Sequence, residues 1–269
     1  MSRQPPAPLL SGVDLPDLGC GHSSAAAAQL FVSAIRMETS TFLEFIRLVV
    51  AGDTDRVSRR LSAAPTLATM ASHVGATRQQ ATAFFFTAVS HYLYGGDTAL
   101  HMASAASSRS MVELLITHGA DCRARNRRGA EPLHYAADGG RREPRTQAGI
   151  IEYLISRGAE PNAVDKSGVA PLHRAVRARS LAAVQALLEG GADPLKPNKS
   201  GSTPLHLAVQ NTGKSGSGSD HAHRQQAAII KLLLAHGARP TDKDSQGRTV
   251  KQAATSAWIR ELLSATEPR

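Results

Sequence analysis

The chain has 269 residues, of which 42% are hydrophobic and only 4% aromatic, and it carries a formal net charge of +9. The hydrophobic content excludes a fully disordered protein. The scarcity of aromatic residues argues against a β-sandwich or barrel and favours helix-on-helix packing. The basic balance suits an acidic protein, nucleic acid or an anionic membrane surface as partner, and charge alone does not choose among these.

Residues 1–37 differ in composition from the rest, with four prolines, a Gly-Cys-Gly and an alanine run. We expect them to form a disordered extension. Arg3 is followed by Gln-Pro-Pro-Ala-Pro rather than by the apolar core of a signal peptide, and no apolar run reaches the roughly 18 residues of a membrane span. Cys20 and Cys122 lie in unlike contexts, so we expect no disulfide and a cytoplasmic location.

Two helices are predicted next, at Phe42–Ala51 and Asp53–Leu61. An aromatic segment, His73–Tyr94, follows them and contains Ala83-Phe84-Phe85-Phe86. We predict that this segment is helical from Thr77 to Tyr92.

Two sequence markers then repeat in step along the chain. The first is a four-residue motif that ends in histidine, at Thr98–His101, Glu131–His134, Ala170–His173 and Thr203–His206. Its histidines are spaced by 33, 39 and 33 residues. The second marker is Gly-Ala followed by Asp, Glu or Arg, and it begins at Gly119, Gly158, Gly191 and Gly237.

A 33-residue period with this motif resembles the ankyrin repeat. The motif's Pro is tolerated in the first turn of a helix, and the Thr before it can cap that helix. The Gly of the second marker can end the following helix in the left-handed conformation. The resemblance implies an all-α repeat, an α-solenoid of helix-turn-helix pairs linked by β-hairpin fingers.

We therefore expect a single ankyrin-repeat domain over residues 38–265, followed by a short tail at 266–269. Atypical first and last repeats are expected, because one face of each meets water. The predicted repeats are approximately 40–72, 95–125, 128–163, 167–196, 200–241 and 246–264.

Three insertions interrupt the 33-residue pattern, at His73–Tyr94, Gly139–Ala148 and Gly213–Arg224. Insertions in repeat proteins often mark the binding face. The first is interpreted as local core over the end of the first repeats or as a hydrophobic hot spot for a partner. The third is rich in Gly, Ser and His, and we predict a solvated loop there.

Three patterns could suggest chemistry. The motif histidines occur once per repeat and cannot converge on one metal ion, and in ankyrin repeats this residue is structural, bonding to the backbone of an adjoining hairpin. Residues Ala208–Ser215 fit a relaxed phosphate-binding loop, but they follow a predicted helix instead of the strand that such a loop requires. Asp220, His221 and His223 could make only a weak metal chelate. We expect no catalytic residues, no cofactor and no metal.

Basic residues cluster on one predicted finger, in the insertion beside it and on the next repeat. They form either an ordinary solvated face or a positive concave strip for an acidic partner. Fold position in the family assigns partner contacts to the finger tips and the inner helices. The residues so assigned are Arg127, Arg128, Asp138, Lys166, Arg177, Lys199, Gln210 and Asn211.

The resulting functional prediction is a non-enzymatic, monomeric scaffold. It would bind a protein partner of acidic character through its concave face and finger tips. The alternative is an accessory protein that binds nucleic acid through the basic strip, or a nucleotide or metal through Gly213–Arg224. Nucleic acid is the weaker choice, because aromatic residues are not interleaved with the basic ones apart from Tyr135.

Overall fold

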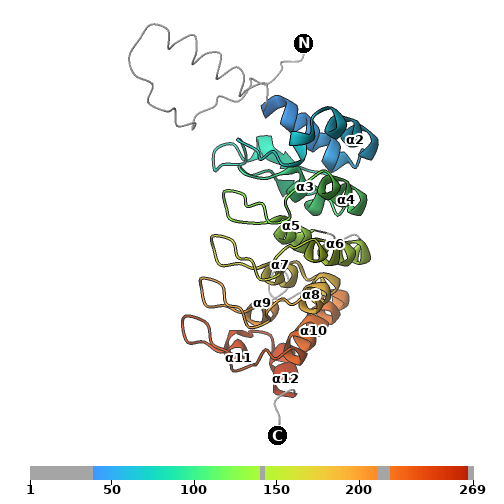
Figure 1. Ribbon diagram of the computed structural model, residues 1–269. Coiled ribbons are helices and arrows are strands. Elements are labelled where there is room, and N and C mark those ends of the chain that lie inside the picture. The colour runs from blue at the N-terminus through green and yellow to red at the C-terminus, as the bar shows by residue number, and fades with distance from the viewer. Residues whose placement is uncertain (1–38, 140–142, 211–218, 266–269) are drawn as a thin grey trace. The chain divides into compact units, whose positions relative to one another are not determined.

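The computed structural model describes residues 39–139, 143–210 and 219–265 (Figure 1). The predicted extension at 1–37, the tail at 266–269 and Asn211 lie outside the described residues. The chain divides into Met1–Ser40 and Thr41–Arg269, and the description below concerns the second unit. None of the described helices is both long and apolar enough to cross a bilayer.

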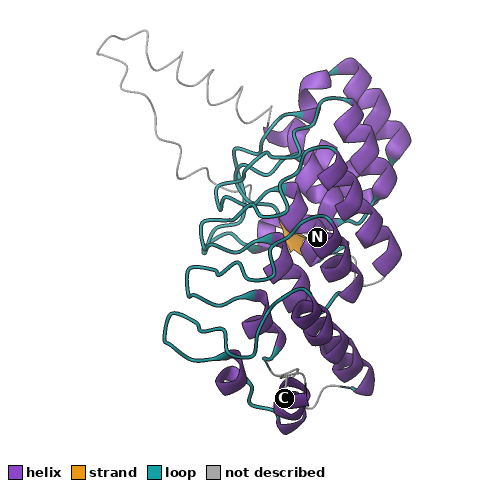
Figure 2. Cartoon of the chain, turned by 60° about the horizontal axis from the view of Figure 1, so that its bottom comes forward, coloured by secondary structure: helices purple, strands orange, loops and turns teal. Residues whose placement is uncertain are grey.

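The described helices follow one another in pairs. Their bounds are residues 39–51 and α2 (Thr54–Ala63), α3 (Ala99–Ala105) and α4 (Arg109–Thr117), α5 (Pro132–Asp138) and α6 (Pro144–Ser156), α7 (Pro171–Ala178) and α8 (Leu181–Glu189), α9 (Pro204–Ala208) and α10 (Asp220–Ala235), and α11 (Val250–Ala253) and α12 (Ala257–Ala265). The short helices α3, α5, α7, α9 and α11 contact one another in sequence and form an inner row, while α2, α4, α6, α8 and α10 form an outer row (Figures 1 and 2). The predicted all-α repeat solenoid is confirmed.

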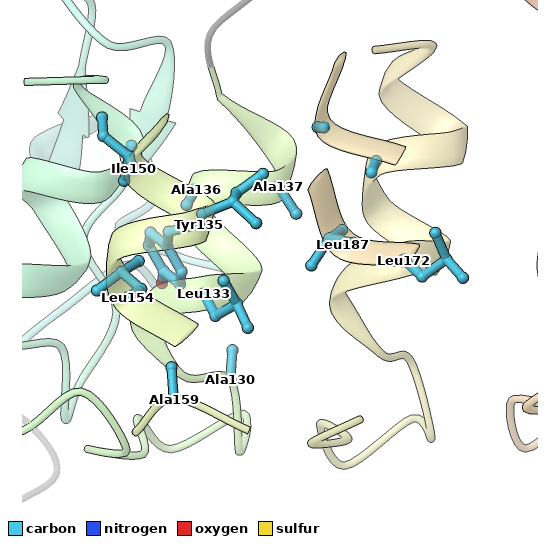
Figure 3. Packing of buried hydrophobic residues seen from close by; sticks show 14 of the residues in the cluster. Ala130, Leu133, Tyr135, Ala136, Ala137, Ile150, Leu154, Ala159, Leu172 and Leu187 are labelled. Atoms are coloured by element: carbon cyan, nitrogen blue, oxygen red, sulfur yellow. The ribbon is translucent and has the colours of Figure 1, made fainter. Parts of the chain in front are cut away.

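One apolar core runs through the stack because each repeat buries equivalent positions. The motif leucines Leu100, Leu133, Leu172 and Leu205 are at most 1% exposed. Apolar residues of the outer helices, such as Ile150 and Leu154 of α6, are buried in the same core (Figure 3). Small residues such as Ala136 and Ala137 let neighbouring helices approach closely.

The motif histidines are buried and form a ladder along the stack, as the sequence predicted. Each ring accepts a hydrogen bond at Nδ1 from the backbone N–H at the start of its own helix, and donates from Nε2 to a carbonyl of the next finger. Their acceptors are Ala130 for His101 (3.1 Å), Val169 for His134 (3.0 Å), Ser202 for His173 (3.1 Å) and Arg248 for His206 (3.4 Å). With both nitrogens engaged, each ring is a neutral structural tie between repeats.

The fingers are loops closed by turns, so the predicted β-hairpins are only partly correct. Each turn is closed by two backbone bonds, as from the Asn126 N–H to the Ala130 carbonyl (3.0 Å) and from the Gly129 N–H to the Asn126 carbonyl (2.8 Å). The Asn126 carboxamide oxygen also accepts from the Arg128 and Ala130 amides. Because a side chain satisfies these amides, the finger does not need a strand ladder. Lys243 and Thr249 form a single bridge in the last finger.

The helix predicted at Thr77–Tyr92 is wrong. The segment instead contains the 3₁₀ turn η2 (Thr82–Phe84) and a two-stranded hairpin of β1 (Phe85–Phe86) and β2 (His91–Tyr92). Aromatic and β-branched residues favour extended backbone. Moreover, Ala71 and Thr98 bridge at the base of the segment, so the chain must return to where it left the stack. We call residues 71–98 the enlarged finger.

The other two insertions lengthen outer helices. Helices α6 and α10 have 13 and 16 residues, whereas α4 and α8 have nine each. His221, His223 and Arg224 therefore lie in α10, which corrects the predicted solvated loop for this part of the insertion. The Ser219 side chain caps the helix by accepting from the Ala222 amide, and this cap explains the correction.

A buried glutamine accompanies each lengthened helix. Gln147 donates to the carbonyls of Ala136 (2.8 Å) and Ala137 (3.2 Å) at the end of α5. Gln226 does the same for Ala208 (2.7 Å) and Gln210 (2.8 Å) at the end of α9. These side chains satisfy the last carbonyls of the inner helices, which would otherwise be buried without donors.

Candidate partner-binding surface

Neighbouring finger tips are joined by backbone hydrogen bonds. In each case the amide of one tip donates to a carbonyl of the tip before it. The pairs are Arg127 to Gly95 (2.8 Å), Lys166 to Arg128 (2.8 Å), Lys199 to Ser167 (3.1 Å) and Ser245 to Ser200 (3.2 Å). We call these tip residues the fingertip row. Because the tips bond to one another, the row is a preformed surface rather than a set of independent loops.

Glycine permits this close approach. Gly201 has a φ of +71°, a conformation that L side chains rarely adopt. A Cβ at Gly201 would lie 2.2 Å from the Ser245 nitrogen of the next finger. Glycine is thus required at position 201 for two reasons. It adopts this positive φ without strain, and any Cβ would clash with the backbone of the next finger.

The fingertip row exposes positive charge. Arg127, Arg128, Lys166 and Lys199 are all exposed and lie on three consecutive tips. Ser167 and Ser200, which complete two of these tips, are neutral. The structure thus places these four predicted contact residues on one row.

The carboxylate next to Lys166 in the chain, that of Asp165, is used internally. Its oxygens accept from the Ser167 amide (2.8 Å), the Val169 amide (3.1 Å) and Arg174 Nη2 (3.1 Å). Burial pushes the pKa of the Asp165 carboxyl upward, but these hydrogen bonds and the Arg174 charge outweigh burial and leave the pKa below its ordinary value. Asp165 therefore stays ionised and paired, and does not cancel the exposed cations of the tips.

Two of the row's arginines also contact the enlarged finger, which sequence reasoning missed. Arg127 Nη2 donates to the Ala76 carbonyl. The Arg128 guanidinium lies over the Tyr94 ring, 4.9 Å from its centroid. A cation over an aromatic face is held in place without losing its charge, so Arg128 remains available to an anion.

The predicted contacts on the inner helices behave differently from those on the fingertip row. Asp138 pairs with Arg177 and with Arg174, at 3.8 Å in both cases. These charges largely neutralise one another. Gln210 is exposed, and its carbonyl accepts from Arg179 Nη2 (3.3 Å). Asp138 and Arg177 therefore differ from the cations of the fingertip row in being paired with each other.

The enlarged finger packs onto the inner helix α5. The His91 ring stacks on Tyr135 with centroids 4.4 Å apart, and Tyr135 is only 1% exposed. The Tyr135 hydroxyl donates to the buried Asp97 carboxylate (2.8 Å), which also accepts from the Asn126 side chain. Burial, followed by the Asp97 charge, raises the pKa of Tyr135 well above its usual value, so the phenol stays a donor. This network fixes the enlarged finger beside the fingertip row.

One repeated feature of the tips could have been found in the sequence. An Asn or Asp precedes each tip glycine by three residues, and its side-chain oxygen accepts from two amides of the turn. The residues are Asn126, Asp165, Asn198 and Asp244. Their regular spacing from Gly129, Gly168, Gly201 and Gly247 is the signal.

The sites considered for small ligands receive less support. Among the described side chains, no group of three or more His, Cys, Asp or Glu is arranged to hold a metal ion. His223 instead packs near Trp258, with centroids 5.3 Å apart. The segment that resembles a phosphate-binding loop begins at Ala208, the last residue of α9, and its Lys214 and Ser215 lie outside the described residues. A helix therefore stands where a phosphate-binding loop needs a strand.

Comparison with known proteins identifies the family. The family model described as ankyrin repeats (3 copies) matches residues 71–144 and 145–244, more than half of the chain. No curated protein matches the chain. Ankyrin repeats are generally protein-interaction modules and typically non-enzymatic. The repeat motif, the helix pairs and this match together show that the chain belongs to the ankyrin-repeat family.

Proposed function

We propose that the protein is a non-enzymatic interaction scaffold that binds an acidic protein partner through the fingertip row and the adjoining concave face. The observation that carries this proposal is the set of four exposed cations, Arg127, Arg128, Lys166 and Lys199, on three tips joined by backbone bonds. A preformed row of like charges attracts a partner of opposite charge and loses little conformational entropy when it binds.

The same proposal includes a monomer in a reducing compartment such as the cytoplasm. Phe85 and Leu195 are the large hydrophobic side chains that are exposed in the described part of the chain, and they are not on one element. Such scattered exposure gives little area for self-association. Cys122 is buried and free, which suits a reducing environment.

The test uses a fluorescein-labelled oligoglutamate peptide and fluorescence anisotropy. The double variant Lys166→Glu/Lys199→Glu should bind the peptide about tenfold more weakly, or worse, because two attractive charges become repulsive. The matched control is Arg224→Glu/Lys231→Glu, which makes the same charge change at exposed positions of α10. Binding by the control should stay within about twofold of the unmodified protein.

Equal loss in both double variants would show that net charge, not the fingertip row, drives binding, and would contradict the proposal. A single-stranded oligonucleotide of the same charge serves as competitor. If it binds more tightly than the peptide and depends on Lys166 and Lys199, nucleic acid replaces the acidic protein as the partner.

A further inference from the structure

We infer that the partner contributes an extended acidic segment with a carboxylate at about every third residue and an apolar residue at the end that meets the enlarged finger. This inference rests on the proposed function and deepens it. It follows from a path of ring contacts that joins the exposed Phe85 to the cations of the fingertip row.

The aromatic half of the path belongs to the enlarged finger. Phe85 is 39% exposed, and its ring lies 4.8 Å from that of Tyr92. Tyr92 in turn lies 6.2 Å from Tyr94, centroid to centroid. Phe85 thus offers an apolar contact, while the tyrosines behind it hold it on the hairpin.

The cationic half begins where the aromatic half ends. Arg128 covers Tyr94 at 4.9 Å, so one contact joins the two halves. From Arg128 the path crosses to Lys166, whose amide donates to the Arg128 carbonyl, and then through Ser167 to Lys199. A ligand that follows this path meets an apolar surface first and then one cation after another.

The distance between tips sets the spacing of the partner's charges. Hydrogen-bonded backbones lie about 4.8 Å apart, and consecutive Cα atoms are about 3.8 Å apart. One step along the row, from Lys166 through Ser167 to Lys199, therefore covers at most about 9 Å. An extended chain advances about 3.3 Å per residue, so close to three residues match one step. An α-helix, with a rise of about 1.5 Å per residue, would need about six residues to cover this step. The nearest spacing that returns to the same face of a helix is about seven residues, or two turns.

The test compares three labelled peptides that carry one phenylalanine near an end and the same number of glutamates. The glutamates stand at every third position, in one block, or at every seventh position of a helix-forming sequence. Anisotropy titrations with the full chain should show about fivefold tighter binding of the every-third peptide than of either other peptide.

The apolar end is tested with Phe85→Thr, which replaces the ring by a β-branched residue that is also favourable in a strand. This variant should weaken the every-third peptide by about threefold to tenfold. It should have no further effect once the phenylalanine of the peptide is replaced by serine, because the two changes remove one contact. Far-UV circular dichroism of each variant checks that the fold is intact.

The possible outcomes distinguish a failure of the inferred segment from a failure of the proposed function. If all three peptides bind equally and Lys166→Glu/Lys199→Glu weakens each of them, the spacing is wrong and the acidic-partner scaffold stands. Tightest binding by the every-seventh peptide overturns the extended segment in favour of a helix. If Phe85→Thr weakens the serine peptide as much as the phenylalanine peptide, the apolar contact is wrong. If no acidic peptide responds to Lys166→Glu/Lys199→Glu, the proposed function fails together with the inference.

Discussion

At the scale of single residues, the motif histidine is the clearest link between sequence and structure. His134 accepts at Nδ1 from the Glu131 amide (3.1 Å) and donates from Nε2 to the Val169 carbonyl (3.0 Å). Burial, followed by the Arg174 charge, lowers the pKa of His134 to about 3. The ring is therefore neutral in the folded protein, and protonation would remove the Nδ1 acceptor.

A pH dependence of stability follows from this pKa. In the unfolded chain the pKa of a histidine is about 6.5, so the unfolded state takes up a proton at a higher pH than the folded state. The free energy of unfolding that the neutral His134 contributes is fully present above about pH 6.5, the pKa in the unfolded chain. It is lost as the pH falls from there toward the folded pKa of about 3. Urea unfolding at pH 7.5 and pH 5 should show a decrease of roughly 2 kcal/mol from His134.

The variant His134→Gln isolates this contribution. It should be less stable at pH 7.5 by about 1–3 kcal/mol, because buried hydrogen bonds are lost, and its stability should change less between pH 7.5 and pH 5. His73→Gln is the control, since His73 is exposed and should leave the pH dependence unchanged. An unchanged slope in His134→Gln would show that other groups cause the pH dependence.

At the scale of elements, the fingers depend on glycine for two different reasons that can be measured separately. Gly201 and Gly247 occupy equivalent positions, with φ values of +71° and +74°. A Cβ at Gly201 would meet the next finger at Ser245, whereas a Cβ at Gly247 would have no atom within 4 Å. Comparing substitutions at Gly201 and Gly247 therefore separates the energetic cost of backbone strain from that of a clash between fingers.

Alanine at either glycine should destabilise the protein, and alanine at Gly201 should do so more. We expect about 1–2 kcal/mol for Gly247→Ala, from the left-handed backbone alone. Gly201→Ala should cost about 1–3 kcal/mol more, because the neighbouring finger must move. Chemical denaturation measures both. Equal costs would mean that the contact between tips contributes little to stability.

At the scale of the whole molecule, stability in a repeat stack is a sum of neighbour contacts, and the terminal repeats have only one neighbour. Helices α11 and α12 form the last described pair, and the short α11 contacts α9. Trp258 is the chain's single tryptophan and lies in α12. Its fluorescence therefore reports on this end alone, while circular dichroism reports on all helices.

We expect the end of the stack to unfold first. In a urea titration, the midpoint of Trp258 fluorescence should come at a lower concentration than the midpoint of the circular dichroism signal at 222 nm. The variant Trp258→Phe, followed by circular dichroism, serves as the control for any stability contributed by the indole itself. Coincident midpoints would instead indicate one cooperative unit.

The amino-acid sequence alone predicts the repeat fold, the inward leucines, the histidine ladder and the chain segments that form the finger tips. These features follow from local rules that repeat with a fixed period, so each copy supports the interpretation of the others. Arg127, Arg128, Lys166 and Lys199 could be placed on the finger tips from the sequence for the same reason.

The fold of the insertions and the charges that remain unpaired depend instead on contacts between distant parts of the chain. The Tyr135–Asp97 bond joins residues 38 apart in sequence, and the Arg127–Ala76 bond joins residues 51 apart. Such contacts have no periodic signal, because they occur once in the chain. For the same reason, the ion pair of Asp138 with Arg177 and the path of ring contacts from Phe85 to Arg128 appear only when the repeats are stacked.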